Sequence, residues 1–308
     1  MKAVRTPAGD RGIALVLVLW VLTLLTVMAL GLTAAQRTET ALTENHLSGA
    51  RFRVVADAAV AFTALHFMMP PPDAMNPDAV VWLPNGTAVD WRFAGVDLRI
   101  RVFNESSRID LNEASPELLS ALLTVLGVAE GEAVALAAAM VDWRDEDDLA
   151  LLHGAEAAEY RQQERAVGPK NAPFMVVEEL LQVLGMTPEL YWLMAPEVSV
   201  DLDGVGYDER YASAVGFAAR EGLTLEDAMI QIAERDAPLF EQGGGPMFVD
   251  RAGPLYRIEV SEEDERGLGR RMEALIEIMP GQQPPYEIRW RRFGLSRAAQ
   301  EIGEVTAN

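Results

Sequence analysis

An uncharged apolar segment near the N-terminus limits what this chain can fold into more than any other feature. It runs from Ile13 to Leu32 as IALVLVLWVLTLLTVMALGL, and its 20 residues include no charged side chain. At about 1.5 Å per residue, a helix of this length matches the roughly 30 Å hydrocarbon core of a bilayer. We therefore expect a transmembrane helix over residues 13–33.

The charges on either side of this segment are asymmetric. Basic residues outnumber acidic ones before it, where Lys2, Arg5 and Arg11 stand with Asp10, whereas Arg37 is followed by Glu39 and Glu44 after it. For a single-pass protein, the positive-inside rule then predicts that residues 1–12 are cytoplasmic and that the bulk of the chain lies outside the membrane. A cleaved secretory signal would have a shorter apolar core and an A-x-A-like site. A plain signal anchor stays open as an alternative.

The residues before the apolar segment resemble a known processing signal. Arg11-Gly12-Ile13 is similar to the end of a type IV prepilin leader, which an inner-membrane prepilin peptidase cleaves after the glycine. The resemblance implies a leader over residues 1–12 and a processing site between Gly12 and Ile13. Most pilins carry Glu at the fifth mature position, where this chain has Leu17. A subunit at the tip of a filament tolerates this loss, because it has no preceding neighbour whose N-terminal amine needs a carboxylate.

The helix is expected to continue outside the membrane over residues 34–69. This stretch contains no proline, and apolar or aromatic side chains recur at helical spacing at Phe52, Val55, Ala59, Phe62 and His66. Pro70-Pro71-Pro72 is expected to end the helix. This apolar stripe predicts that the helix packs under a sheet. The alternative is that the stripe packs against a partner helix.

The chain then shows strand patterns. A hairpin is expected from Val80–Leu83 and Ala88–Phe93 around Pro84-Asn85-Gly86, because Asn-Gly favours tight turns. A third strand is expected where apolar residues alternate with arginines, at Leu98, Ile100 and Val102. Similar patterns return at Tyr256–Val260, Met272–Met279 and Tyr286–Trp290. We predict a discontinuous antiparallel β domain from residues 70–109 and 251–295.

Residues 110–250 interrupt this β domain with helical patterns. Ser115-Pro116 is a favourable helix start, and Leu126-Gly127-Val128 predicts a turn between two helices. A related unit is expected around Leu184-Gly185-Met186, followed by the cap Thr187-Pro188. The predicted fold class is therefore α+β: a pilin-like long N-terminal helix, transmembrane at its start, packed on an antiparallel sheet, with a large inserted all-α domain of helix-hairpin-helix or SAM-like type.

Helix-hairpin-helix units also occur in membrane-anchored DNA-binding and DNA-uptake proteins, so this function has to be weighed. Their hairpins hold phosphates through backbone amides and nearby Lys or Arg. Here the hairpins carry Glu130, Glu132 and Glu189, and the whole chain has a formal net charge of -21. These charges repel phosphates. We expect a packing or docking role and no nucleic-acid partner.

A dense acidic loop follows the first hairpin. Asp142-Trp143-Arg144-Asp145-Glu146-Asp147-Asp148 places five carboxylates in seven residues. Clustered carboxylates suit Ca²⁺, which takes 6–8 oxygen ligands. The spacing does not match an EF-hand, and a solvated acidic loop is the other reading.

Catalytic signatures are missing from the sequence. The histidines, His46, His66 and His153, are scattered, and there is no G-x-S-x-G elbow, P-loop or H-E-x-x-H motif. The chain has no Cys, which removes thiol nucleophiles and disulfides. We expect no enzymatic activity.

Taken in order, these features resemble the family of minor pseudopilin K of the bacterial type II secretion system, also called general secretion pathway protein K. The best-matching pieces are the leader, Ile109–Ser115, Asp142–Asp148, Asn171-Ala172-Pro173 and Leu184–Pro188. Residues 198–248 match the family poorly, and they include the run Gly243–Pro246.

The resemblance implies a structural component at the tip of a secretion pseudopilus, serving protein transport across the outer membrane. It implies assembly with minor pseudopilins of the I, J and H types, and contact with secreted cargo or the secretin. It also implies Ca²⁺ near the insertion, for which we name Asp142, Asp145, Asp147, Asp148 and Glu156. The alternative is a minor pilin of a type IV pilus, which usually lacks such an insertion.

Overall fold

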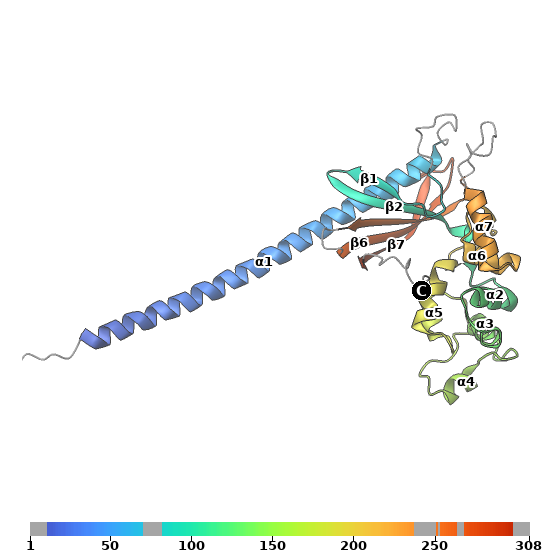
Figure 1. The fold of residues 1–308 in the computed structure, drawn as a ribbon, viewed down its shortest axis with the longest axis horizontal. Coiled ribbons are helices and arrows are strands. Elements are labelled where there is room, and N and C mark those ends of the chain that lie inside the picture. The colour runs from blue at the N-terminus through green and yellow to red at the C-terminus, as the bar shows by residue number, and fades with distance from the viewer. Residues whose placement is uncertain (1–10, 70–81, 237–250, 252, 264–267, 298–308) are drawn as a thin grey trace, which may run out of the picture. The chain divides into compact units, whose positions relative to one another are not determined.

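The computed structural model describes residues 11–69, 82–236, 251, 253–263 and 268–297 (Figure 1). The chain divides into two compact units, Met1–Val55 and Ala56–Asn308, and helix α1, Arg11–Met68, runs from the first into the second. All side chains from Leu15 to Thr33 are exposed. Among the described residues, α1 is the one helix that is long and apolar enough to cross a membrane. Residues 1–10 of the predicted leader, and the predicted helix stop at Pro70–Pro72, lie outside the described residues.

The second unit contains a five-stranded antiparallel sheet in the order β1-β2-β5-β6-β7. Its strands are β1 Val89–Phe93, β2 Val96–Asn104, β5 Leu255–Glu263, β6 Leu268–Ile278 and β7 Tyr286–Arg297. Strand β2 alternates strictly between buried apolar residues and exposed charged residues over its first seven residues, because one of its faces covers the core. The predicted antiparallel sheet, with strands drawn from two distant parts of the sequence, is confirmed.

The predicted hairpin around Asn85-Gly86 is wrong. The turn lies instead at Ala94-Gly95, between β1 and β2, and both residues have positive φ angles, 50° and 73°. Two left-handed residues are what a two-residue hairpin turn needs. The segment with Asn85 pairs with the far end of β2, where the Gly86 amide donates to the Val102 carbonyl at 2.8 Å.

The last turns of α1 pack on this sheet, as the apolar stripe predicts. Ala56, Ala59, Val60, Thr63 and Ala64 form the buried face of the helix within the second unit. The ring of Phe62 stacks on Trp91 of β1 with a centroid distance of 5.4 Å. On the opposite edge of the sheet, Arg291 of β7 donates to Asp57 at 2.7 Å. The helix therefore crosses the sheet from one edge strand to the other.

A helical insertion separates β2 from β5, and Figure 1 shows its helices gathered beside the sheet. They are α2 Pro116–Val125, α3 Glu130–Arg144, α4 Ala157–Gln162, α5 Pro188–Met194, α6 Ala214–Glu221 and α7 Leu225–Asp236. Short 3₁₀ helices also occur, at η1 Glu105–Ser107, η2 Val177–Gln182, η3 Ala195–Glu197 and η4 Glu209–Tyr211. One apolar cluster, which includes Leu119, Leu122, Met140, Trp143 and Tyr160, forms the core of the insertion.

Local sequence explains where these helices begin and end. The Ser115 hydroxyl accepts a hydrogen bond from the Leu118 amide at 3.3 Å and so caps α2. Gly127, with a φ angle of 93°, lets the chain turn from α2 into α3. In the second predicted unit, Thr187 caps α5 as expected, but the preceding element is the 3₁₀ helix η2 and not an α-helix.

A two-stranded parallel ladder lies within the insertion, and a buried ion pair beside it joins the insertion to the sheet. Strand β3, Ile109–Asp110, pairs with β4, Val198–Ser199. Beside it, the fully buried Glu105 accepts hydrogen bonds from Arg257 of β5 and from the Ser199 hydroxyl, the latter at 2.6 Å. Arg108 lies 3.5 Å from the same carboxylate. Burial opposes ionisation of Glu105, but the charges of Arg257 and Arg108 outweigh it and lower its pKa.

Candidate metal site in the acidic loop

The acidic loop begins where α3 ends. The Arg144 guanidinium, at the last residue of the helix, donates to the carbonyl oxygens of Leu111 and Ala114. This fixes the end of α3 against the segment that precedes α2. In the same segment, the Asn112 side-chain amide donates to the Phe174 carbonyl at 3.0 Å. The Phe174 backbone amide donates in turn to the Asn112 side-chain oxygen at 2.7 Å. The helix end is therefore held against residues 111–114, which are themselves bonded to the segment of Phe174.

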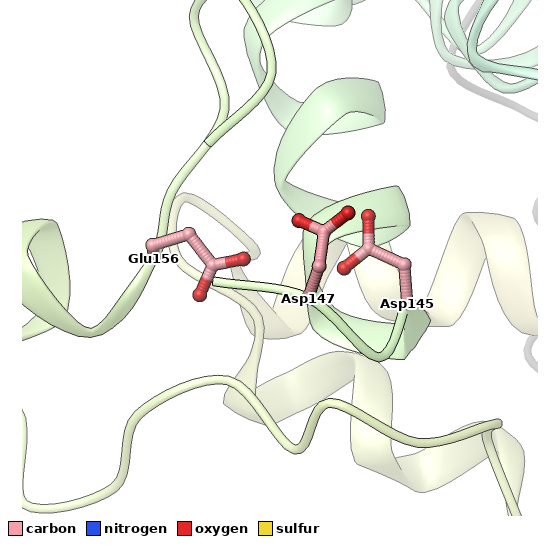
Figure 2. Close-up of side chains that lie close together, drawn as sticks. All are labelled: Asp145, Asp147 and Glu156. Atoms are coloured by element: carbon pink, nitrogen blue, oxygen red, sulfur yellow. The ribbon is translucent and has the colours of Figure 1, made fainter. Parts of the chain in front are cut away.

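Three carboxylates converge in this loop (Figure 2). One oxygen each from Asp145, Asp147 and Glu156 lies within 4.8 Å of the others. Figure 2 shows Asp145 and Asp147 just beyond the end of α3, with the side chain of Glu156 reaching toward them from the segment before α4. Asp145 Oδ1 and both carboxylate oxygens of Glu156 are buried and have no hydrogen-bond partner among the described residues.

The electrostatics of the cluster are unfavourable in the absence of a cation. Burial away from water, followed by the negative charges of Asp142, Asp145 and Asp148, raises the pKa of Glu156 to about 7. Burial and the charges of Asp142 and Asp147 also raise the pKa of Asp145. Buried carboxylates without donors favour either protonation or a bound cation.

Asp142 differs from the other predicted ligands because its carboxylate binds backbone amides. Its carboxylate accepts hydrogen bonds from the Leu151 amide, at 3.1 Å, and the Ala155 amide, at 2.8 Å. It therefore closes the loop by holding both ends of residues 151–155. A Cβ atom at Gly154 would overlap the Asp142 carboxylate, so glycine is needed at this position for the loop to close.

Asp148, the fifth predicted ligand, bonds to a neighbouring loop. Asn171 donates from its side-chain amide to Asp148 Oδ1 and to the Asp147 carbonyl, both at 3.0 Å. The other side-chain atom of Asn171, its carbonyl oxygen Oδ1, is buried and has no hydrogen-bond partner among the described residues. Sequence reasoning did not place Asn171 in the site, although the Asn171-Ala172-Pro173 motif was one of the best family matches.

The donor set fits a hard cation. Carboxylate and amide oxygens are the ligands that Ca²⁺ prefers, and four such atoms lie buried and without partners around this loop, on Asp145, Glu156 and Asn171. The structure thus brings together three of the five predicted ligands, Asp145, Asp147 and Glu156, and gives Asp142 and Asp148 hydrogen-bonding roles that hold the loop in shape. The two residues of the predicted processing site, Gly12 and Ile13, lie in the first turn of α1.

The fold defines the class of protein: an α+β protein with a pilin-like long N-terminal helix, an antiparallel sheet and a helical insertion. Residues 100–201 match the family model described as type II secretion system (T2SS), protein K. Putative type II secretion system protein K of Escherichia coli (strain K12) is 25% identical over 207 residues, covering 62% of this chain and 62% of that protein. Type II secretion system protein K of Klebsiella pneumoniae is 30% identical over 204 residues, covering 61% of this chain and 62% of that protein.

A solved structure has the same fold. A chain in the crystal structure of the GspK-GspI-GspJ complex from the enterotoxigenic Escherichia coli type 2 secretion system matches with a TM-score of 0.55 and 15% identity, covering 82% of this chain and 99% of that one. The family model and the two curated relatives support the resemblance of the chain to the type II secretion system protein K family, and the solved structure shows the same fold. The matches to the two curated relatives span less than two thirds of their length.

Proposed function

We propose that this protein is a minor pseudopilin at the tip of a type II secretion pseudopilus, where it is a structural component for protein export across the outer membrane. The observation that carries the proposal is the match of residues 100–201 to the protein K family. This region contains the α2–α3 hairpin and the acidic loop, which set the chain apart from a plain pilin. The pilin-like fold supports the same assignment.

The proposal places the protein in the inner membrane with its N-terminus in the cytoplasm and its bulk in the periplasm. The exposed apolar surface from Leu15 to Thr33 supports a spanning segment. Prepilin peptidase would remove residues 1–12 by cleaving between Gly12 and Ile13. Leu17 at the fifth mature position supports a subunit that sits first in the filament.

The proposed partners are minor pseudopilins of the I, J and H types. The fold match to a chain of a GspK-GspI-GspJ complex supports an assembly of this kind. The helical insertion emerges between β2 and β5, and it would face the secreted cargo or the secretin at the tip. Glu130 and Glu132 are exposed in the first turn of α3, beside the hairpin turn, which argues against nucleic acid as a partner.

The proposal also includes a structural calcium ion in the acidic loop and no catalytic activity. Asp145, Asp147 and Glu156 would bind the ion, and the side-chain oxygen of Asn171 is a further candidate ligand. When bound, the ion would neutralise carboxylates that otherwise repel one another. Asp142 and Gly154 would keep the loop in the shape that places them together.

The N-terminus of the membrane-extracted protein tests the class of protein. We expect a mature N-terminus at Ile13 when the cognate peptidase is present, and an intact Met1 when it is absent. A Gly12→Glu variant should stay uncleaved, while Gly31→Ala, a matched change farther along the same helix, should be processed normally. Cleavage elsewhere, or an intact Met1 with active peptidase, would remove the pilin-like assignment.

Co-purification tests the tip role separately. The mature protein should be recovered in a complex with the I-type and J-type pseudopilins of the same secretion system, when the three are produced together in one cell. Normal processing without any such complex would leave a pilin-like protein but contradict the tip role.

A further inference from the structure

An apolar groove lies on the helical insertion, and its lining does not include the three clustered carboxylates. It is formed by α2, α3, the end of α6 and the loop that carries Leu151 and Leu152, and its volume is about 680 Å³. We call it the α2–α3–α6 groove. Its apolar lining includes Val125, Val134, Leu151, Leu152, Ala218 and Leu223. Volumes of about 300–1,000 Å³ are typical of sites that enclose a ligand.

The side chains at the rim of this groove are unusually exposed. Leu152 is 82% exposed and Val134 is 41% exposed. Neither is needed for the core of the insertion, which is formed by other residues. Apolar side chains around a concavity mark an interaction site more strongly than single exposed apolar residues do.

The groove is held in shape before any partner binds. Asp142 fixes the loop with Leu151 and Leu152 through the amides of Leu151 and Ala155. The other walls are helices that pack against one another, with α2 in contact with both α3 and α6. Because the groove is already ordered, binding of a partner would cost less free energy.

The charges around the groove select the kind of partner. The charged residues that line it, Glu117 and Glu130, are both acidic and exposed. Between Asp110 and Asp236 the chain has 26 acidic and seven basic residues. Arg220, which follows the groove residues of α6, lies over the ring of Tyr207 with its guanidinium carbon 4.0 Å from the ring centroid. An acidic rim attracts cationic side chains and repels carboxylate or phosphate groups.

We propose that the α2–α3–α6 groove docks an amphipathic helix of a partner protein, with apolar side chains on the groove and Lys or Arg side chains toward Glu117 and Glu130. Grooves between packed helices commonly take the apolar face of another helix. The charge complementarity favours a basic helix over an acidic one and over the head group of an anionic lipid. This docking surface goes beyond the proposed place of the protein in the pseudopilus.

A designed helical peptide of leucine and lysine, with one apolar face, tests the proposal. Its binding to the full-length protein in zwitterionic nanodiscs is followed by fluorescence anisotropy, and binding to empty nanodiscs is subtracted. We expect saturable binding that weakens at least about tenfold in the double variant Leu152→Ser/Val134→Ser, because the apolar contacts are lost. The control Met229→Ser changes an apolar residue on α7 that is 58% exposed and lies outside the groove, and this variant should bind like the wild type.

Two further peptides separate the contributions of shape and charge. A shuffled peptide of the same composition without an apolar face, and an amphipathic peptide of leucine and glutamate, should both bind at least about tenfold more weakly. The double variant Glu117→Gln/Glu130→Gln should weaken the leucine-lysine peptide and reduce its salt dependence. Equal binding by the Leu152→Ser/Val134→Ser and Met229→Ser proteins, or by the glutamate peptide, would overturn the proposal. Preferential binding of anionic lipid vesicles at the same residues would overturn it as well.

Discussion

The sheet and the helical insertion use charged residues in opposite ways. Across β5, β6 and β7, arginines face carboxylates on neighbouring strands, as in the pairs Arg271–Glu259 and Arg270–Glu262, at 2.6 and 3.2 Å. In the insertion, acidic residues outnumber basic ones by 26 to seven, and carboxylates gather in one loop where several oxygens have no donor. Charges in the sheet thus pair with one another, whereas the acidic loop of the insertion leaves carboxylate oxygens that no described donor contacts, as expected for the proposed cation site.

The largest expected effect is at the boundary between the two regions. Glu105→Ala leaves Arg257 and Arg108 buried without their counter-charge. We expect the free energy of unfolding to fall by about 3–5 kcal/mol. Thermal unfolding of the purified protein, followed by circular dichroism, measures this loss. A loss below about 1 kcal/mol would mean that water reaches the arginines and that the pair behaves like a surface pair.

The second prediction concerns calcium. If Asp145, Asp147 and Glu156 bind the ion, calcium at 100 times its dissociation constant should stabilise the protein by about 2.7 kcal/mol. The double variant Asp145→Asn/Asp147→Asn should lose this response. Melting temperatures measured in calcium and in a chelator give the result.

The matched control for calcium is Glu130→Gln/Glu132→Gln, which removes two exposed carboxylates from the same insertion. It should keep the full calcium response. A wild-type protein that melts identically in calcium and in chelator would contradict the metal site.

The third prediction uses pH in the absence of calcium. The pKa of Glu156 is raised from its ordinary value of 4.5 to about 7, so the folded protein holds this proton more tightly than the unfolded chain. The stability that protonated Glu156 contributes is therefore present below about pH 4.5 and is lost as the pH rises through about 7.

Glu156→Gln should remove this dependence. In chelator at pH 8, the variant should be more stable than the wild type by about 1–2 kcal/mol, a fraction of what the pKa difference alone gives. The difference should shrink at pH 5, and it should reverse in calcium, where the carboxylate is a ligand. Unfolding at the two pH values checks the sign, and a variant that is less stable than the wild type at pH 8 in chelator would contradict it.

The smallest effect is expected for a solvent-exposed ion pair between helix α1 and the sheet. Asp57 and Arg291 connect α1 with β7, and both side chains are about half exposed. Asp57→Asn should cost less than about 1 kcal/mol, because solvent screens exposed pairs. A much larger loss in thermal unfolding would show that this pair, like the one at Glu105, supports the packing of the helix on the sheet.

Features that follow from local periodicity could be predicted from the sequence. The uncharged run from Ile13, the alternation in β2 and the Ser115 cap each depend on residues a few positions apart, and each is found in the structure. The hairpin turn was misplaced because Asn85-Gly86 satisfies the local rules for a turn, while the choice of strand partner depends on contacts that are distant in sequence.

The sequence predicted which loop holds the candidate site, but not which of its side chains lie close together. The density of carboxylates marks residues 142–148, yet nothing in their spacing separates the residues that face one another from Asp142, which holds backbone amides. Asn171 and Gly154 belong to the site through contacts in space. Only the folded chain shows that the asparagine side chain lies beside the aspartates.

The Glu105 carboxylate also determines how mechanical force would pass through the molecule. It contacts β5 through Arg257 and β4 through Ser199, close to where the chain leaves the sheet for the insertion. A push or pull on the helices is therefore transmitted to the middle strand of the sheet through side chains, and not through the peptide backbone alone. This makes the junction a stiff coupling, and motion of the insertion would be carried directly to the sheet.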